Sequence, residues 1–197
     1  MRSAKLQILM LGNSFTSANG LPQLLAEKTG ARVVAHTRGG ARLAEQLNPK
    51  TKLGAKTQAA LASIPWDYVL LQEMSHGPIT ARERFLDSAA QLCTAIRQNG
   101  AVPIFFSTWP YQKGGAKLSA KGWDYDEMAG ALFSAYRQSA RENHAPLAEV
   151  GQLFYALSPS QNLYAADGVH PNLTGSRLAA RALAAVILQQ EEQHHDP

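Results

Sequence analysis

Residues 6–16 read Leu-Gln-Ile-Leu-Met-Leu-Gly-Asn-Ser-Phe-Thr, and the fold prediction starts from this segment. Its first six residues are almost continuously apolar, which is typical of a strand covered on both faces of a parallel sheet. A polar turn at residues 12–14 ends the strand. A helix is expected next at residues 21–29, with a proline in its first turn and a glycine just past its end.

The same alternation of short apolar runs and longer amphipathic runs continues along the chain. Strands are expected at residues 6–11, 32–36, 68–72, 102–107 and 147–150. Further helices are expected at residues 57–64, at 80–99 with Thr80 and Glu83 as a capping box, from 124 to about 142, and from 172 to about 190. Strands that alternate with helices form right-handed βαβ units.

The sequence therefore predicts an α/β protein with one domain over residues 1–197 and a frayed tail at residues 191–197. The expected architecture is a three-layer α/β/α sandwich. Its sheet has five parallel strands in flavodoxin-like order.

Length and composition exclude several classes of protein. The chain has 197 residues, of which 45% are hydrophobic and 17% charged, so it can bury a core and is not expected to be disordered. No apolar run approaches the about 18 residues of a membrane span. The Lys and Arg residues are scattered, so no nucleic-acid surface is predicted.

Cofactor and metal motifs are missing from the sequence. The single cysteine, Cys93, excludes an internal disulfide and a CxxC metal site, and its helical setting predicts a buried thiol. No Walker loop, GxGxxG or HExxH motif occurs, so neither a cofactor nor a metal is expected. The sequence gives no indication of the oligomeric state.

The first residues carry no pattern typical of a secretory leader. Residues 1–5 lead directly into the first expected strand, whereas a leader has a longer apolar stretch and a small-residue cleavage site. We therefore expect a cytoplasmic protein from the sequence as written. Removal of a leader from a longer precursor would make it periplasmic or secreted.

Polar residues follow the expected strands at their carboxyl ends, where ligands bind to open α/β sheets. Ser14 follows the first strand, Gly40 the second and Gln72 the third. Asp167 and His170 lie beyond the fifth strand, three residues apart. Because the carboxyl ends of parallel strands lie at one edge of the sheet, we expect these residues to meet in one crevice.

Asp167 and His170 have the spacing of a base and the group that orients it. Across a short turn the carboxylate can accept a hydrogen bond from one imidazole nitrogen, which leaves the other nitrogen as a base. Such a base would activate Ser14 as a nucleophile, and amides at the start of a helix would stabilise an oxyanion. Each motif alone is more often a turn or a helix cap, so their order along the chain carries the hypothesis.

In these residues the sequence resembles the SGNH hydrolases, also called GDSL-like esterases and lipases. Residues 12–14, Gly-Asn-Ser, are similar to the first block of the family, Gly-Asp-Ser. Gly40 is similar to the glycine of the second block, and residues 167–170 match the Asp-x-x-His of the fifth. The resemblance covers residues 6 to about 188 and is closest to a bacterial subgroup that begins Gly-Asn-Ser-Phe-Thr.

The resemblance implies ester hydrolysis without a cofactor. Ser14 would be the nucleophile, His170 the base and Asp167 the residue that fixes the imidazole tautomer. The amide of Gly40 would contribute to the oxyanion hole. A Gly-x-Ser-x-Gly elbow of the α/β-hydrolases does not occur in the sequence.

The third block departs from the family pattern, which is usually Gly-x-Asn-Asp with the asparagine donating to the oxyanion. Gln72 offers the same carboxamide donor on a side chain one methylene longer, so we expect it in the oxyanion hole. Gln72-Glu73 is similar to the Gln-Gly-Glu element of sialate-O-acetylesterase-like carbohydrate esterases. Ser75 and His76 are the other candidate donors, and an alternative role for Glu73 is an ion pair with an arginine that holds the loop.

Aromatic residues gather in the long irregular stretch at residues 109–124. We expect Trp109, Tyr111 and Trp123 to bind substrate, together with Asn13 beside the nucleophile, because aromatic rings pack against sugar rings and acyl chains. Core packing is the alternative for each aromatic ring. The expected substrate is a small-molecule or carbohydrate ester, first of all a small acyl group on a carbohydrate. A lysophospholipase, a thioesterase and a non-catalytic carbohydrate-binding module stay open.

Overall fold

The computed structural model describes residues 5–195 and contains a parallel sheet of five strands in the order β2-β1-β3-β4-β5. The strands are β1 (Gln7–Gly12), β2 (Arg32–Thr37), β3 (Tyr68–Leu71), β4 (Val102–Phe106) and β5 (Leu147–Ala148). The strand order reverses at β1, because the chain first adds β2 on one side and then crosses over to β3. The predicted α/β fold and its flavodoxin-like order are confirmed.

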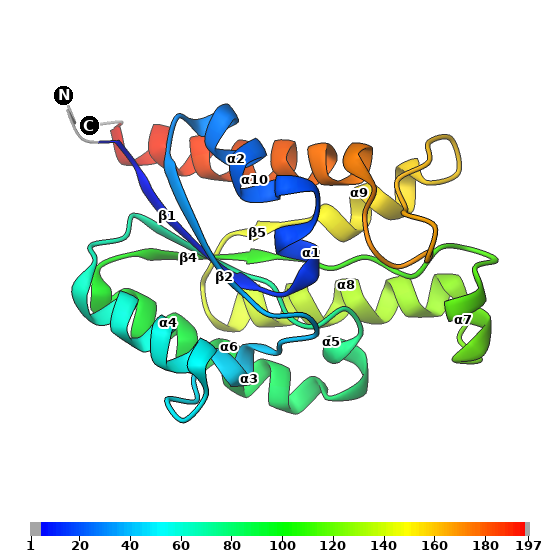
Figure 1. The fold of residues 1–197 in the computed structure, drawn as a ribbon, viewed down its shortest axis with the longest axis horizontal. Coiled ribbons are helices and arrows are strands. Elements are labelled where there is room, and N and C mark those ends of the chain that lie inside the picture. The colour runs from blue at the N-terminus through cyan, green and yellow to red at the C-terminus, as the bar shows by residue number, and fades with distance from the viewer. Residues whose placement is uncertain (1–4, 196–197) are drawn as a thin grey trace.

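Helices cover both faces of the sheet (Figure 1). One face carries α2 (Leu21–Thr29), α9 (Val150–Leu157) and α10 (Leu173–His195), with the short α1 (Ser14–Ser17) and the 3₁₀ turn η1 (Ala18–Gly20) at its edge. The other face carries α3 (Leu43–Gln46), α4 (Lys52–Ser63), α5 (Gly77–Thr80), α6 (Arg82–Asn99) and α8 (Tyr125–Glu142). The short α7 (Ala116–Ala120) interrupts the irregular stretch after β4.

The continuous apolar run of β1 is explained by two cores, one on each side of the sheet. Ile8 and Met10 pack with α2 and α10 in the first core, whereas Leu9 and Leu11 pack with α4 and α6 in the second. All four side chains are at most 1% exposed. Alternate residues of a strand point to opposite faces, so a strand between two helical layers is apolar at every position.

The helix expected at residues 80–99 begins later, at Arg82. Thr80 belongs to α5, and its hydroxyl donates to the carbonyl of His76 at 3.2 Å. The capping box predicted from Thr80 and Glu83 is therefore wrong, because Pro78 starts a separate turn of helix before α6. The predicted start of α8 is confirmed, since the Asp124 carboxylate accepts hydrogen bonds from two amides of the first turn.

The frayed tail predicted at residues 191–197 is wrong for residues 191–195, which continue α10; residues 196–197 lie outside the described residues. The Tyr68 hydroxyl donates to the Glu191 carboxylate at 2.6 Å, which ties this end of the helix to the sheet. Cys93 is fully buried, and desolvation raises the pKa of its thiol to about 11.

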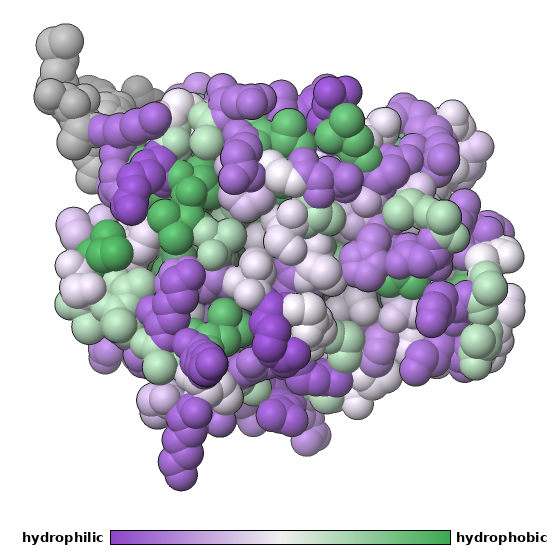
Figure 2. Space-filling view, in the orientation of Figure 1, coloured by the Kyte–Doolittle hydropathy of each residue, from purple (hydrophilic) through white to green (hydrophobic). Residues whose placement is uncertain are grey.

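No helix within residues 5–195 is long and apolar enough to cross a membrane. The same residues contain no group of three His, Cys, Asp or Glu side chains placed to hold a metal ion. On the face shown in Figure 2, hydrophobic residues lie in small groups separated by hydrophilic ones.

A glycine allows α9 to start directly against the end of β4. The Gly151 amide donates to the Ser107 hydroxyl at 2.9 Å, and a Cβ added at Gly151 would lie 2.1 Å from the Thr108 carbonyl oxygen. Gly130 in α8 is a useful contrast, because a Cβ there would have no heavy atom within 4 Å.

We expect Gly151→Ala to lower the free energy of unfolding by about 1–3 kcal/mol, because the added methyl forces α9 away from β4. The matched control Gly130→Ala should raise it by about 0.5–1 kcal/mol, since alanine favours a helix interior over glycine. Urea denaturation measures both values. An equal effect of the two substitutions would contradict the close approach of α9 and β4.

Candidate active site

Asn13 and Ser14 form the turn between β1 and α1. The Asn13 side chain caps α1 by accepting a hydrogen bond from the Phe15 amide at 3.0 Å, and its amide group donates to the Ala41 carbonyl at 3.1 Å. Asn13 is only 2% exposed. The expectation that Asn13 contacts substrate is therefore wrong, because both ends of its carboxamide are used to join the first two strand-end loops.

Ser14, His170 and Asp167 form a continuous chain of hydrogen bonds. The Ser14 hydroxyl lies 2.8 Å from Nε2 of His170, and Nδ1 of His170 lies 2.5 Å from the Asp167 carboxylate. The second carboxylate oxygen accepts from the amides of Val169 and His170, both at 3.0 Å. The arrangement has the connectivity that the sequence predicted for these residues.

The Asp167 carboxylate is stabilised in its charged form. Partial desolvation raises the pKa of Asp167, but hydrogen bonds from the His170 ring and from the backbone amides of Val169 and His170 lower it, and the net pKa lies below its usual value. A charged carboxylate at Nδ1 holds the proton on that nitrogen and leaves Nε2 as the acceptor toward Ser14. The Asp167 and His170 side chains are 41% and 39% exposed, so a solute can reach the chain of hydrogen bonds.

Trp109 is a core residue, not the substrate wall that the sequence predicted. It is fully buried and stacked between Phe15 and Phe154, with ring centroids 4.4 and 4.1 Å away. Its indole N–H donates to the Val169 carbonyl at 3.0 Å. Trp109 therefore contacts the neighbours of both Ser14 and His170, and it fixes the two segments relative to each other.

Gln72 does not present its carboxamide to the crevice, so its predicted place in the oxyanion hole is not what the structure shows. It is 1% exposed, and its oxygen accepts hydrogen bonds from the Thr16 hydroxyl at 2.8 Å and the Asn13 amide at 3.2 Å. Its amide group donates to the carbonyl of Glu73. The carboxamide lies beneath the turn that carries Ser14 and supports that turn from below.

Glu73 holds the loop that follows β2. Its carboxylate accepts hydrogen bonds from the amides of Leu43 at 3.0 Å and Met74 at 2.8 Å, and it faces the Arg42 guanidinium at 3.8 Å. Desolvation raises the pKa of Glu73, which is 2% exposed, and these donors partly oppose that effect. The alternative role considered for Glu73, an ion pair with an arginine that holds the loop, agrees with this geometry.

Backbone amides remain as candidate oxyanion donors. Within the described residues, no hydrogen bond uses the amide of Ser14 or that of Gly40. Gly40 has a φ of +68°, in the left-handed region that favours glycine. The loop of Gly40 is joined to the Ser14 turn through the hydrogen bond from Asn13 to Ala41.

Tyr111 and Trp123 form an aromatic cluster with His76. The His76 ring lies 5.4 Å from Trp123 and 6.3 Å from Tyr111, measured between centroids. The Tyr111 hydroxyl bonds the Ser75 hydroxyl at 3.2 Å, and His76 bonds the Thr80 hydroxyl at 3.1 Å. The other two candidate donors, Ser75 and His76, are therefore engaged within this cluster.

The cluster also borders a small apolar cavity. The cavity measures about 240 Å³, and Ile79, Trp123 and Met128 contribute its large apolar side chains. Trp123 is half-buried there, whereas Tyr111 is 6% exposed. Of the three aromatic residues predicted to bind substrate, Trp123 alone keeps a substantial open surface.

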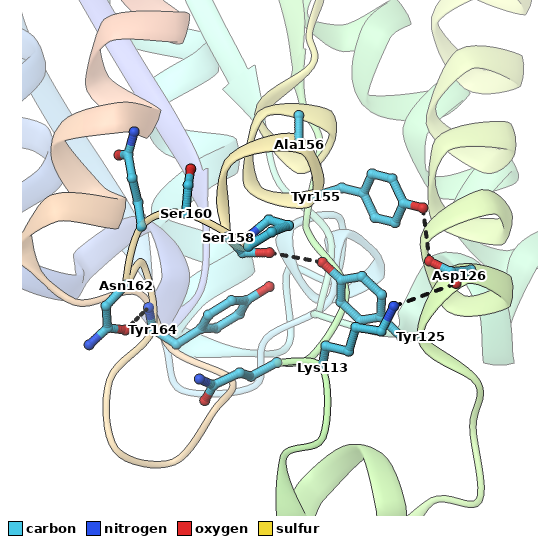
Figure 3. A pocket seen from close by; sticks show the side chains of 12 residues that line it. Lys113, Tyr125, Asp126, Tyr155, Ala156, Ser158, Ser160, Asn162 and Tyr164 are labelled. Atoms are coloured by element: carbon cyan, nitrogen blue, oxygen red, sulfur yellow. Dashed lines mark hydrogen bonds and ion pairs between the residues drawn. The ribbon is translucent and has the colours of Figure 1, made fainter.

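A larger pocket of about 710 Å³ is shown in Figure 3, and none of Ser14, Asp167 and His170 contributes to its lining. Tyr125, Tyr155 and Tyr164 surround it, with hydroxyl and amide side chains from residues 158–162 between them. The backbone N–H of Gln112, a residue of the pocket wall, donates to the Gly168 carbonyl at 2.8 Å, in the turn between Asp167 and His170. Sequence patterns did not single out this pocket, because its tyrosines are far apart in the chain.

Similarity to known proteins places the site in a family. Comparisons with protein-family models and with curated proteins give no match. Among solved structures, a protein from Slackia heliotrinireducens assigned to the SGNH hydrolases is 51% identical with a TM-score of 0.90, and the match covers 93% of this chain and 100% of that chain. The chain therefore belongs to the SGNH hydrolase family, which confirms the resemblance found in its motifs.

More distant structures share the fold. A DUF4886 family protein from Bacteroides uniformis is 18% identical with a TM-score of 0.70, and the match covers 94% of this chain and 84% of that one. An acetyl xylan esterase is 15% identical with a TM-score of 0.69, over 92% of this chain and 100% of that one. At these identities the matches show the α/β/α architecture alone.

We expect Asp167→Asn to lower kcat by about 10²–10⁴-fold, because the neutral amide no longer fixes the His170 tautomer or stabilises its cation. The amide oxygen can still accept from Val169 and His170, so the turn and the melting temperature should be preserved. Steady-state kinetics on 4-nitrophenyl acetate and a thermal melt measure the two effects. Asp87, whose carboxylate is exposed, gives the control, and Asp87→Asn should match the wild type in kcat and in melting temperature. An equal loss of kcat in the two variants would contradict the role of Asp167.

Proposed function

We propose that this protein is a serine esterase that removes small acyl groups from a carbohydrate. The observation that carries the proposal is the hydrogen-bonded chain from Ser14 through His170 to Asp167. A hydroxyl bonded to an imidazole whose other nitrogen meets a carboxylate is the arrangement of an activated nucleophile. No cofactor takes part in this chemistry.

The first half of the reaction forms an acyl-enzyme. Ser14 Oγ attacks the ester carbonyl while its proton passes to Nε2 of His170, and Asp167 stabilises the resulting imidazolium. The backbone amides of Ser14 and Gly40 donate to the carbonyl oxygen as it becomes negatively charged. When the bond to the leaving alcohol breaks, His170 returns the proton to the alcohol oxygen.

The second half of the reaction releases the acid. A water molecule takes the place of the alcohol and gives a proton to Nε2 of His170 as its oxygen attacks the acyl-enzyme. The second tetrahedral intermediate collapses with return of that proton to Ser14 Oγ. The free enzyme and a carboxylic acid are the products.

The pocket of Figure 3 supports a carbohydrate as the alcohol part of the substrate. The alcohol leaves beside His170, and Gln112 in the pocket wall is hydrogen-bonded through its backbone N–H to Gly168, two residues before His170. Tyr125 and Tyr155 are stacked with centroids 5.4 Å apart, and the Tyr155 hydroxyl donates to Asp126 at 2.8 Å. Aromatic rings beside hydroxyl, amide and charged groups suit a sugar, which has apolar ring faces and many hydroxyls.

The other candidate functions have weaker support. A long acyl chain of a lysophospholipid or thioester needs an extended apolar channel, whereas the apolar cavity beside Trp123 measures about 240 Å³, below the about 300–1,000 Å³ of pockets for drug-sized ligands. A non-catalytic module has no need for a histidine held between a serine and a carboxylate. The arrangement of Ser14 and His170 therefore favours an enzyme over a binding module.

We expect a fluorophosphonate probe to label the wild type and not the Ser14→Ala variant, because an activated serine hydroxyl is the group that such a probe acylates. Turnover of 4-nitrophenyl acetate should be lost in the variant, while the melting temperature should shift little. Ser75→Ala is the matched control and should keep the label. Labelling that survives in Ser14→Ala but disappears in Ser75→Ala would move the nucleophile to Ser75.

We expect hydrolysis of 4-nitrophenyl esters to fall steeply from acetate to long acyl chains, and acetate to be released from acetylated oligosaccharides. Tyr155→Ala should lower kcat/KM for the oligosaccharide relative to 4-nitrophenyl acetate by about tenfold, since a lost aromatic contact costs roughly 1 kcal/mol or more. Leu188→Ala, a change of an exposed apolar residue on α10 outside the pocket, serves as the control. A preference for long acyl chains would contradict the proposed substrate.

A further inference from the structure

A second polar pocket lies beside Gly40. It measures about 400 Å³, and three arginines and one glutamate contribute all the charged side chains of its wall: Arg38, Arg42, Arg84 and Glu45. Gly40 itself is part of the wall. An excess of guanidinium groups in a concave site attracts anions.

The loop at one side of the pocket is hydrogen-bonded to the residue that precedes the proposed nucleophile. Gly40 and Arg42 flank Ala41, whose carbonyl accepts the hydrogen bond from the Asn13 side chain next to Ser14. A solute in this pocket therefore lies against the same loop that holds the Gly40 amide.

The pocket beside Gly40, which we call the arginine pocket, is separate from the pocket of Figure 3. Residues 38–51 and Arg84 contribute the wall of the arginine pocket. The wall of the other pocket comes from residues 112–113, from α8 and α9 and from residues 158–164, so no residue lines both.

The charges around the pocket do not cancel. Arg38 is neutralised by Glu45, because its Nε donates to that carboxylate at 2.8 Å and a second nitrogen makes a further contact with it. The buried Glu73 carboxylate faces Arg42 at 3.8 Å. Desolvation raises the pKa of Glu73, whereas the charges of Arg42 and Arg84 both act to lower it, so one carboxylate stands against two arginines. Arg84 makes no ion pair within residues 5–195, so a positive charge is left over in the pocket.

The N–H donors of the Arg42 and Arg84 side chains are not used by other groups of the described residues. The Glu73 carboxylate is already bonded to the amides of Leu43 and Met74, and its 3.8 Å distance to Arg42 is an ion pair without a hydrogen bond. In the described part of the chain, neither arginine side chain donates a hydrogen bond to another protein group. A guanidinium has five N–H donors in a planar fork that matches a carboxylate.

We propose that this pocket binds a carboxylate carried by the ester substrate, with Arg42 and Arg84 as the residues that contact it. The inference rests on the proposed esterase activity and makes its substrate an acidic ester. Two guanidinium groups with unused N–H donors lie beside the loop that carries the Gly40 amide. They would hold the anion and place the ester carbonyl over Ser14. An acidic sugar that bears an acyl group and a dicarboxylic half-ester both carry the required chemistry.

The test compares esters that differ only in charge. Mono-4-nitrophenyl glutarate is paired with 4-nitrophenyl valerate to place the carboxylate in the acyl part, and 4-acetoxybenzoate is paired with methyl 4-acetoxybenzoate to place it in the alcohol part. We expect the wild type to prefer the anionic member of one pair in kcat/KM, and the pair concerned identifies which part of the substrate lies in the pocket. The preference should weaken as salt is raised, because ions screen the arginines.

Variants assign the preference to the pocket. Arg84→Gln should lower the ratio of anionic to neutral kcat/KM by about fivefold, and the Arg42→Gln, Arg84→Gln double variant should lower it further. Arg177→Gln on α10 is the matched control, since Arg177 is exposed and lies outside this pocket. An unchanged ratio in Arg84→Gln and in the double variant would overturn the proposal.

Binding without turnover separates this proposal from the esterase itself. Calorimetry with the Ser14→Ala variant should show tighter binding of the preferred anionic ester than of its neutral partner, and the difference should disappear when Arg84→Gln is added. Equal binding of both esters with intact hydrolysis of the neutral one would overturn the acidic substrate and leave the esterase standing. Selective binding without hydrolysis by the wild type would overturn the esterase and leave the carboxylate site standing.

Discussion

The contact of 2.8 Å between the Ser14 hydroxyl and Nε2 of His170 joins two groups that are 156 residues apart in the chain. Neither loop could hold this distance alone, because an unsupported loop moves by more than a hydrogen bond can tolerate. The two loops are fixed through Trp109, which stacks on Phe15 and bonds the Val169 carbonyl. The sheet and its helices hold the loops of Ser14, Trp109 and His170 in fixed positions relative to one another.

Buried polar side chains lie beneath the site and form a hydrogen-bond network. Gln72 and Glu73 follow β3, and together they bond the loops that follow β1 and β2. The Tyr136 hydroxyl accepts from the Glu73 amide at 3.1 Å, and desolvation raises the pKa of that buried phenol. A buried network in which each member is satisfied holds its groups in one arrangement. The polar residues after the third strand therefore position the site from below.

The sequence predicted the strands, their order, most of the helices and the Ser14, His170 and Asp167 set, because each depends on local patterns. Periodicity identifies buried strands, and a carboxylate three residues before a histidine meets it across one turn. The roles of Gln72 and Trp109 depended on which way a side chain points at the end of a strand, which local pattern does not determine. The arginine pocket needed α6 beside the loop after β2, a contact between segments distant in sequence.

Asp167 and His170 share one turn. Residues 158–162, which form part of the wall of the pocket of Figure 3, come just before that turn in the chain. Insertions or deletions in this wall would leave the spacing of the acid and the base unchanged. Evolution can thus remodel the shape of the pocket without disturbing the proton-transfer pair. A single ancestral scaffold with this layout can diversify its leaving-group preference by changes in loop length, while its chemistry is inherited intact.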